Sequence, residues 1–322
     1  MEVATVDYHT AGEPFRIVVS GGPEVPGATV RERREHAAAT DGIDRVRRLL
    51  CHEPRGHADM YGCFVVPPDD PGADLGVLFW HKDGYSTACG HGTIALGAWA
   101  VDTGVVPAPD DGEVEITIDV PSGRVVARVV RRGGAVELVA FRNVPAYVIA
   151  RGIPVAEVEV DIAYGGAIYA FVPAARFGLR VVPEDLPALI AAGREVKAAL
   201  DGADVARHPE DDRLSGIYGT VLTEEVDGPL HQRNVAIFAD GEVDRSPTGS
   251  ATSARCALLA AELGPGRVLR NDSIVGTTFL ARVLGQRDGA VLTEVEGTAF
   301  RTGEHRFTLD PRDPLGTGFV LR

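Results

Sequence analysis

Residues 89–98 of the chain read CGHGTIALGA, and residues 248–257 read TGSATSARCA. The two stretches align without a gap, and in each a glycine follows the first residue. Further along, Thr93 matches Thr252, Ala95 matches Ala254 and Ala98 matches Ala257. This pattern predicts that a helix begins at each stretch. The clearest difference is at the first position, where Cys89 in one copy faces Thr248 in the other. The repeat predicts an internal duplication, with a site built between two similar halves.

The composition is that of an ordinary globular protein. A length of 322 residues suits two domains, and 45% hydrophobic with 24% charged residues provides for a sizeable core. The net charge of -14 argues against nucleic acid and anionic membranes as partners, although it does not exclude an anionic substrate. The first residues lack the features of a signal peptide, and no apolar run approaches the ~18 residues of a membrane span. We therefore expect a cytoplasmic protein.

Four cysteines in a chain of this length do not indicate a disulfide framework. Cys256 lies in an apolar helical run, so we expect a buried and unreactive thiol. A metal site made of Cys51, His52, His57 and Cys63 is also disfavoured, because their spacing matches no common zinc pattern. We expect neither a metal nor a cofactor.

The remaining pattern predicts halves rich in strands, each with one central helix. It differs from the strict alternation of strand and helix in a doubly wound sheet. Helices are expected at 31–50, from 90 to about 101, at 184–200 and from 249 to before 264. Strands are expected at 3–8, 15–19, 64–66, 75–79, 114–118, 125–130, 135–141, 157–162, 167–172, 218–222 and 234–238, with more strands toward the end and a loop at 201–212.

The two helix starts have a definite chemistry. The first amides of a helix have no intrahelical partner, and the helix dipole adds about half a positive charge there. Gly90 and Gly249 leave those amides open to a ligand, so two such starts facing each other would bind a small carboxylate. The same field lowers the pKa of a thiol, which makes Cys89 a candidate base or nucleophile. A buried, structural cysteine is the alternative.

Competing interpretations of these segments are less well supported. Phosphate binding by residues 90–92 lacks both a P-loop and the dinucleotide-binding glycine spacing. A Cys–His protease requires an imidazole against the sulfur, but His91 lies two positions along a helix that turns away. Asp244 is suited to bind a cationic amine and equally suited to cap a loop, and His91 is suited to bind either a ligand or a backbone carbonyl.

Several ordered blocks together resemble the proline racemase family. The resemblance rests on Cys89–Thr93, Asp244–Ser250, Asp7–Pro14, Glu53–Gly62, Asp161–Gly166 and Ser273–Gly276, which extend over essentially the whole chain. It implies a mixed α/β fold like that of diaminopimelate epimerase, with two pseudo-symmetric halves that each wrap strands around a central helix. It also implies a cofactor-independent site in the cleft between them. We expect one half to comprise 1–143 with 304–322 and to carry Cys89, and the other to comprise 144–303 and to carry Thr248.

The chain departs from the family's racemases and 4-hydroxyproline epimerases at Thr248, where those enzymes have a second cysteine. Inversion of an α-carbon needs a proton-transferring group on each face, and a threonine hydroxyl is too weak an acid or base to be one of them. The combination of cysteine and threonine resembles trans-3-hydroxy-L-proline dehydratases, so the resemblance implies dehydration to Δ1-pyrroline-2-carboxylate. In this hypothesis Cys89 removes the α-proton and Thr248 hydrogen-bonds near the departing hydroxyl. The expected substrate-binding residues are Gly90, His91, Asp244, Gly249, Ser250, Tyr61 and Phe238.

Two alternatives stay open at this point. The first is a racemase or epimerase of proline or 4-hydroxyproline, in which water or Thr248 assists. The second is a small-molecule binding protein that keeps the site but has lost turnover. Tyr61 and Phe238 have an alternative of their own, as ordinary core aromatics. The expected partner is a small imino acid, and the resemblance leaves a homodimer possible.

Overall fold

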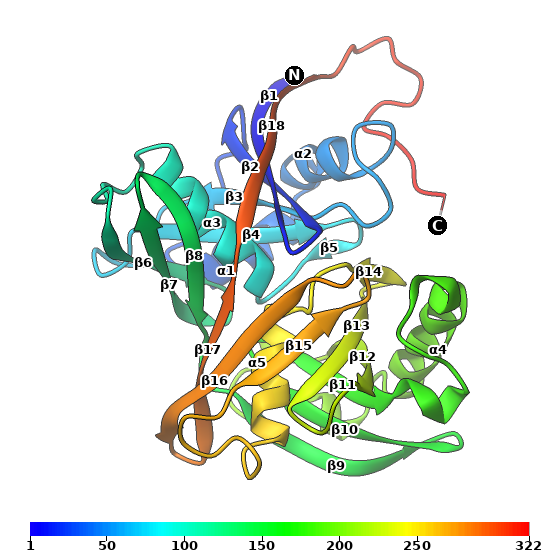
Figure 1. The fold of residues 1–322 in the computed structure, drawn as a ribbon. Helices are drawn as coiled ribbons and strands as arrows, with labels where there is room; N and C mark the ends of the chain where they lie inside the picture. The colour runs from blue at the N-terminus through cyan, green and yellow to red at the C-terminus, as the bar shows by residue number, and fades with distance from the viewer. Residues whose placement is uncertain (322) are drawn as a thin grey trace. The chain divides into compact units, whose positions relative to one another are not determined.

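The computed structural model describes residues 1–321, which form two compact units (Figure 1). Unit 1 comprises residues 1–87, 91–139 and the last segment from 298, and unit 2 comprises residues 88–90 and 140–297. Cys89 and Gly90 therefore belong to unit 2, together with Thr248, while the rest of the helix that Gly90 begins belongs to unit 1. The domain ranges expected from the sequence remain a prediction.

Unit 1 is a mixed sheet with helices. Its strands pair in the order β18–β1–β2–β3–β4–β6–β7, with parallel pairs at β2–β3 and β4–β6 and a short β4–β5 hairpin. The elements are β1 (Glu2–Thr10), β2 (Glu13–Ser20), α1 (Val30–Ala39), α2 (Asp41–Cys51), β3 (Gly62–Val66), β4 (Leu75–His81), β5 (Gly84–Tyr85), α3 (Gly90–Asp102), β6 (Gly112–Val120), β7 (Gly123–Arg132), β8 (Ala135–Arg142) and β18 (Ala299–Thr308), of which α3 and β8 cross into unit 2 by their ends.

Unit 2 repeats this plan. Its order is β9–β10–β11–β12–β13–β15–β16–β17, with parallel pairs at β11–β12 and β13–β15 and a short β13–β14 hairpin. The elements are β9 (Tyr147–Val155), β10 (Val158–Tyr164), β11 (Ile168–Pro173), α4 (Leu186–Ala199), β12 (Ile217–Glu225), β13 (His231–Phe238), β14 (Glu242–Asp244), α5 (Gly249–Leu258), β15 (Leu269–Ser273), β16 (Thr278–Arg287) and β17 (Ala290–Gly297), with short 3-10 turns at 174–177, 183–185, 204–206 and 212–214.

The two units thus share one sequence of pairings. In both, an antiparallel pair leads to helices, then to a parallel partner strand, a hairpin, a buried helix and a second parallel partner. The buried helices are α3 and α5, the two segments that the sequence repeat singled out. The expectation of two similar halves with a central helix each is confirmed by this repeat.

The central helices are buried almost all round, as a helix enclosed by strands must be. Every residue of α3 from Gly90 to Val101 is buried, and in α5 only Arg255 is partly exposed. In unit 2, Ala251, Ala254 and Leu258 of α5 pack against aromatic residues of the sheet. Small residues on these helices let the strands approach closely, which fixes where each helix begins.

Three expectations about elements need correction. The helix expected at 31–50 is two helices, because Thr40 adopts an extended backbone and its carbonyl accepts the amides of Ile43 and Asp44, which begins a new helix. The second central helix ends at Leu258, earlier than expected, and is followed by turns. Strand β9, at 147–155, was not foreseen, because its residues are mostly half-exposed and lack a regular apolar alternation.

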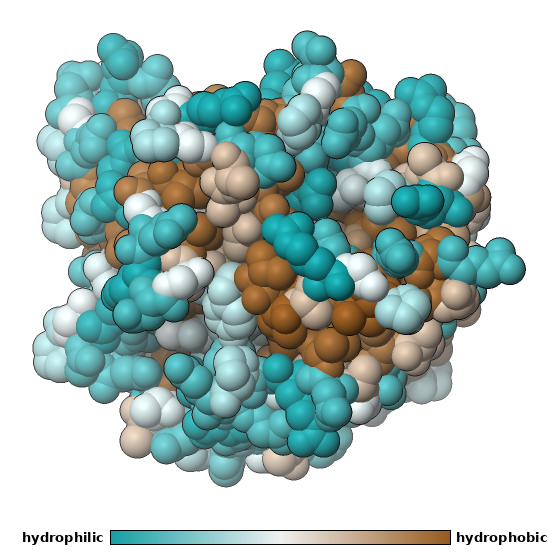
Figure 2. Space-filling view, turned by 90° about the horizontal axis from the view of Figure 1, so that it is seen from below, coloured by the Kyte–Doolittle hydropathy of each residue, from teal (hydrophilic) through white to brown (hydrophobic). Residues whose placement is uncertain are grey.

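The exterior shows no long apolar helix. Among residues 1–321, no helix is long and apolar enough to cross a membrane. The face drawn in Figure 2 carries apolar areas that hydrophilic side chains separate from one another.

Candidate active site

The segment before α5 places Thr248 by local hydrogen bonds. The carboxylate of Asp244 accepts the amide of Ser246 at 2.7 Å, and the Ser246 hydroxyl accepts the amide of Thr248 at 3.1 Å. Thr248 then adopts φ 57° and ψ 94°, a left-handed backbone that costs a β-branched residue of order 1 kcal/mol or more. A strained residue persists only when its surroundings hold it in place.

The Pro247 carbonyl accepts the hydrogen bonds that hold this segment in place. It accepts the Thr252 hydroxyl at 2.8 Å and the side-chain amides of Asn234 at 3.0 Å and Asn271 at 3.3 Å. Asn271 also donates to the Thr252 hydroxyl at 2.8 Å. No spacing pattern in the sequence marks the two asparagines. The hint for Asn234 is an amide residue next to apolar residues of the same strand.

Thr248 also carries a buried hydroxyl without a partner. The residue is 6% exposed, and its Oγ1 has no hydrogen-bond partner among the residues that the structure describes. An unpartnered buried hydroxyl costs about 1–3 kcal/mol, so this atom is available to hydrogen-bond to a ligand.

The start of α3 is equally buried. Cys89 is 5% exposed, and the following helix is anchored within unit 1 by the Thr10 hydroxyl, which donates to the His91 carbonyl at 2.9 Å. The thiol thus lies immediately before a helix N-terminus and is shielded from bulk water. The position before a helix N-terminus favours the thiolate, whereas burial alone opposes it, so the helix start is the feature that favours a reactive cysteine here.

The two helix starts meet at their glycines. A Cβ added to Gly90 would lie 2.5 Å from Gly249 Cα and 2.8 Å from Ser250 N. No real side chain tolerates such distances to backbone atoms, so the glycine is required for this approach. The structure therefore brings the segments that carry Cys89 and Thr248 together, and their first amides have no intrahelical partners.

The other predicted site residues divide between the units. In unit 2, Asp244 is 3% exposed, and Phe238 stacks on Tyr218 with ring centroids 5.6 Å apart. In unit 1, the His91 and Tyr61 rings meet edge to face at 4.9 Å, and the Tyr61 hydroxyl hydrogen-bonds to Ser86. Phe238 and Tyr61 each belong to an aromatic cluster, which fits both a substrate-binding and a core role.

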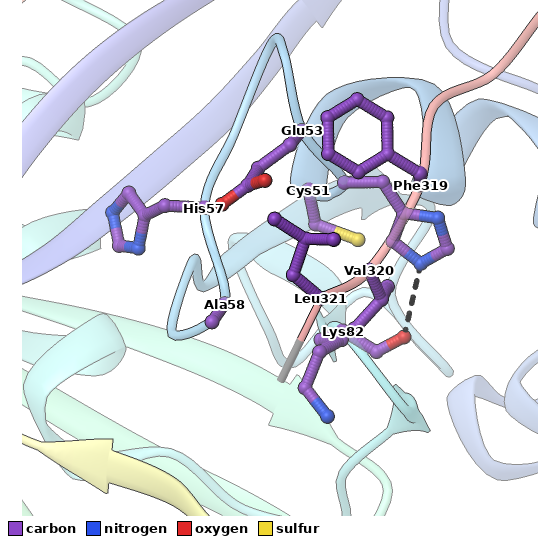
Figure 3. Close-up of a pocket in the computed structure, with 9 residues that line it drawn as sticks. Cys51, Glu53, His57, Ala58, Lys82, Phe319, Val320 and Leu321 are labelled. Atoms are coloured by element: carbon purple, nitrogen blue, oxygen red, sulfur yellow. Dashed lines mark hydrogen bonds between the residues drawn. The ribbon is translucent and has the colours of Figure 1, made fainter. Parts of the chain in front are cut away.

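The cysteines and histidines considered above for a metal site do not belong to the two helix starts. Cys51, His52 and His57 line a small pocket with the C-terminal residues Phe319 to Leu321 (Figure 3). Burial lowers the pKa of His52, whose ring hydrogen-bonds to the Lys82 carbonyl at 3.4 Å. Cys63 is not among the residues lining this pocket.

Burial also decides the character of two thiols. It raises the pKa of Cys63 well above its usual value and that of Cys256 to about 12. Both are fully buried, so the expectation of a buried Cys256 is confirmed. None of the four cysteines forms a disulfide in the part of the chain that the structure describes.

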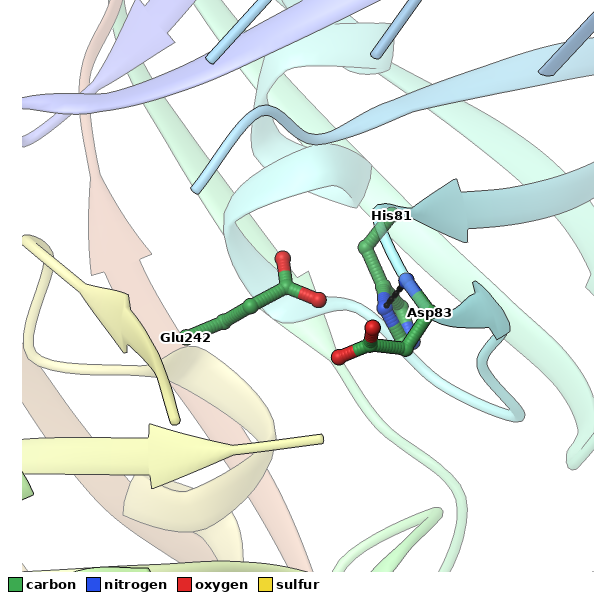
Figure 4. Close-up of side chains that lie close together, drawn as sticks. All are labelled: His81, Asp83 and Glu242. Atoms are coloured by element: carbon green, nitrogen blue, oxygen red, sulfur yellow. Dashed lines mark hydrogen bonds between the residues drawn. The ribbon is translucent and has the colours of Figure 1, made fainter. Parts of the chain in front are cut away.

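His81 and Asp83, drawn in Figure 4, are joined by a local hydrogen bond in unit 1. The Asp83 amide donates to His81 Nδ1 at 3.2 Å, which uses one ring nitrogen as an acceptor. Glu242, also drawn, belongs to unit 2, so it is not counted with them as a ligand set.

Comparison with known proteins identifies the family that shares this sequence and fold. The family model of proline racemase matches residues 5–320. The chain belongs to the proline racemase family. Trans-3-hydroxy-L-proline dehydratase of Bacillus cereus is 43% identical over 98% of this chain and 97% of that protein. The 3-hydroxyproline 2-epimerase of Burkholderia multivorans is 44% identical over 99% of this chain and 98% of that protein.

A solved structure within the proline racemase family confirms the fold class. The hydroxyproline epimerase from Agrobacterium vitis, solved with bound trans-4-hydroxy-L-proline, superposes with a TM-score of 0.91 at 27% identity. The match covers 99% of this chain and 96% of that chain.

Proposed function

We propose that this protein dehydrates trans-3-hydroxy-L-proline to Δ1-pyrroline-2-carboxylate without a cofactor. The observation that carries the proposal is the meeting of two helix starts, one entered from a cysteine and the other from a threonine. The same activity is named for relatives at 41–44% identity over nearly the whole chain.

The substrate carboxylate is bound by backbone amides. Those of Gly90, His91, Gly249 and Ser250 lie at the helix starts, where the dipole favours a negative charge. Asp244, with His91, holds the ring nitrogen, because a buried carboxylate is a suitable partner for a protonated amine. Tyr61 and Phe238 contribute aromatic surface against the ring.

Proton removal is the task of Cys89. Its thiolate takes the hydrogen from the α-carbon, and the electron pair moves into the carboxylate to give an enediolate. The helix amides stabilise this extra charge, which is typically the largest contribution to such a rate.

Loss of water follows on the adjacent carbon. In the trans isomer the hydroxyl is opposite the carboxylate, so it lies on the same ring face as the α-hydrogen. The protonated Cys89 can therefore give its proton to the departing hydroxyl as the C–O bond breaks and the ring C=C bond forms. The resulting enamine moves its nitrogen proton to carbon and becomes the cyclic imine. Thr248 contributes a neutral hydrogen-bond donor to a substrate oxygen during this step.

Epimerisation of a hydroxyproline is the second candidate, favoured by the similarity to the 3-hydroxyproline 2-epimerase. It requires a second proton-transferring group where this chain has Thr248. A small-molecule binding protein without turnover is the third candidate. Cys89→Ser distinguishes it from the two enzymes, because in a binding protein the substitution leaves ligand affinity intact and there is no activity to lose.

The test is incubation with trans-3-hydroxy-L-proline, trans-4-hydroxy-L-proline and L-proline, following imine formation and optical rotation together. We expect imine from the first substrate only, and a fall of at least about 100-fold in Cys89→Ser, since a serine hydroxyl is a far weaker base. Rapid inversion without imine would contradict the proposal.

A further inference from the structure

A pair of hydroxyls lies beneath the start of α5. The phenol of Tyr169 and the hydroxyl of Ser250 are hydrogen-bonded at 2.7 Å, and the two residues are 1% and 2% exposed. Ser250 is the second residue of α5, and its amide nitrogen lies where Gly90 and Gly249 meet. The inference that follows rests on the proposed function, since Ser250 is one of the residues assigned to the substrate carboxylate.

The Tyr169 ring is held rigidly. Tyr169 belongs to β11, which pairs with β10 on one side and β12 on the other. Its ring meets Tyr218 edge to face at 5.8 Å and Phe171 at 6.4 Å. A buried ring in contact with two neighbouring rings leaves the phenol little freedom beyond the rotation of its hydrogen.

The phenol stays protonated at working pH and so remains a donor. Burial raises the pKa of Tyr169 above its ordinary value. The Ser250 hydrogen bond opposes this effect, and the charges of Asp244 and Cys89 add smaller increases of the pKa. When the phenol donates to Ser250 Oγ, the serine hydrogen is left for another acceptor.

The equivalent position in the other half carries a different residue type. In the repeat, His91 corresponds to Ser250, and its ring neighbours are Phe15 at 5.7 Å and Tyr61 at 4.9 Å, both in contact by ring edges. The tyrosine–serine pair therefore belongs to the half that carries Thr248 and distinguishes it from the half that carries Cys89.

We propose that Tyr169 is a positioning residue that, by donating to Ser250, directs the Ser250 hydroxyl toward the substrate carboxylate. The Ser250 amide and hydroxyl then both donate to an oxygen that becomes more negative as the enediolate forms. A donor that strengthens as charge develops acts mainly on the rate of proton removal. Tyr169 itself does not touch the substrate.

The test is a double-mutant cycle of Tyr169→Phe and Ser250→Ala, assayed with trans-3-hydroxy-L-proline in unlabelled and α-deuterated forms. Each single variant is expected to lower kcat about tenfold with KM changed by less than about threefold, and the double variant is expected to be no worse than Ser250→Ala. The isotope effect on kcat is expected to equal or exceed that of the parent protein, because proton removal becomes more rate-limiting. The matched control is Tyr218→Phe, which removes a phenol hydroxyl from another tyrosine of the same cluster. Its kcat should stay within about twofold of the parent value.

Three results would overturn the inference. The first is a loss of kcat in the double variant equal to the product of the two single losses. The second is a Tyr169→Phe protein whose kcat lies within twofold of the parent value. The third is a raised KM with kcat unchanged. Melting temperatures show whether a loss comes from misfolding, and an altered kcat at unchanged melting temperature supports the pair. A parent protein that forms no imine would overturn the proposed function and this inference with it, whereas an active parent with an unaffected Tyr169→Phe overturns the inference alone.

Discussion

A single side chain, Thr248, separates the proposed reaction from an inversion. Its hydroxyl is buried without a partner in the described chain, and its backbone is strained, so the position is built for a ligand and not for local stability.

Thr248→Cys is expected to lower the rate of dehydration at least tenfold and to introduce inversion of the α-carbon. A thiol on the second helix start supplies the missing acid, so the carbanion is reprotonated before the hydroxyl departs. Chiral chromatography of recovered trans-4-hydroxy-L-proline measures the inversion, with Thr248→Ser as the control that keeps a hydroxyl. Dehydration at the parent rate in Thr248→Cys would remove the assigned role.

At position 90, close contact with neighbouring backbone atoms requires a glycine. Gly90→Ala is expected to lower the free energy of unfolding by about 1–3 kcal/mol and activity by at least tenfold, because the new methyl group meets the backbone of Gly249 and Ser250. Denaturant unfolding and the imine assay measure the two effects. Gly42→Ala is the matched control near the start of another helix, since a Cβ there meets nothing within 4 Å; an equal loss in both variants would refute the explanation.

At the scale of elements, the buried side chain of Arg16 joins β1, β2 and α2 through an ion pair and further hydrogen bonds. Arg16 donates to Asp7 through Nε and Nη2, the latter at 2.8 Å, and through Nη1 to the carbonyls of Leu50 at 2.7 Å and Arg55 at 2.9 Å. The last two bonds fix the loop after α2 that leads to the Tyr61 segment.

Arg16→Gln is expected to lower the free energy of unfolding by about 3 kcal/mol, because it leaves the Asp7 carboxylate buried without its main partner. Arg312→Gln, which breaks an exposed pair with Asp310, should lower the free energy of unfolding far less than Arg16→Gln. Urea titration compares them. Equal stability of the two variants would show that the buried pair contributes nothing beyond a surface pair.

At the scale of the whole molecule, the proposed chemistry uses only groups of the chain itself. Exhaustive dialysis against EDTA is therefore expected to leave the rate of imine formation unchanged within about twofold, because helix amides and not a metal ion stabilise the enediolate. Inactivation that Zn²⁺ or Mg²⁺ reverses would contradict this expectation.

Much of this architecture followed from the sequence. The repeated segments at 89–98 and 248–257 predicted two similar halves with a central helix each, because small and apolar residues at helical spacing after a glycine determine a buried helix wherever the chain goes. The identity of Cys89 and Thr248 likewise fixed the difference between the halves, because proton affinity is a property of the side chain itself.

Other features depended on contacts between segments far apart in the chain. That Gly90 approaches Gly249, that Asn234 and Asn271 hold the Pro247 carbonyl, and that Tyr169 meets Ser250 are consequences of how strands pair. Local spacing carries no record of such pairs, since hydrogen-bond partners in a sheet are set by register and not by sequence distance. The sequence by itself determined which groups can do the chemistry, and only the tertiary structure decided which of them are held together, because proximity is created by packing.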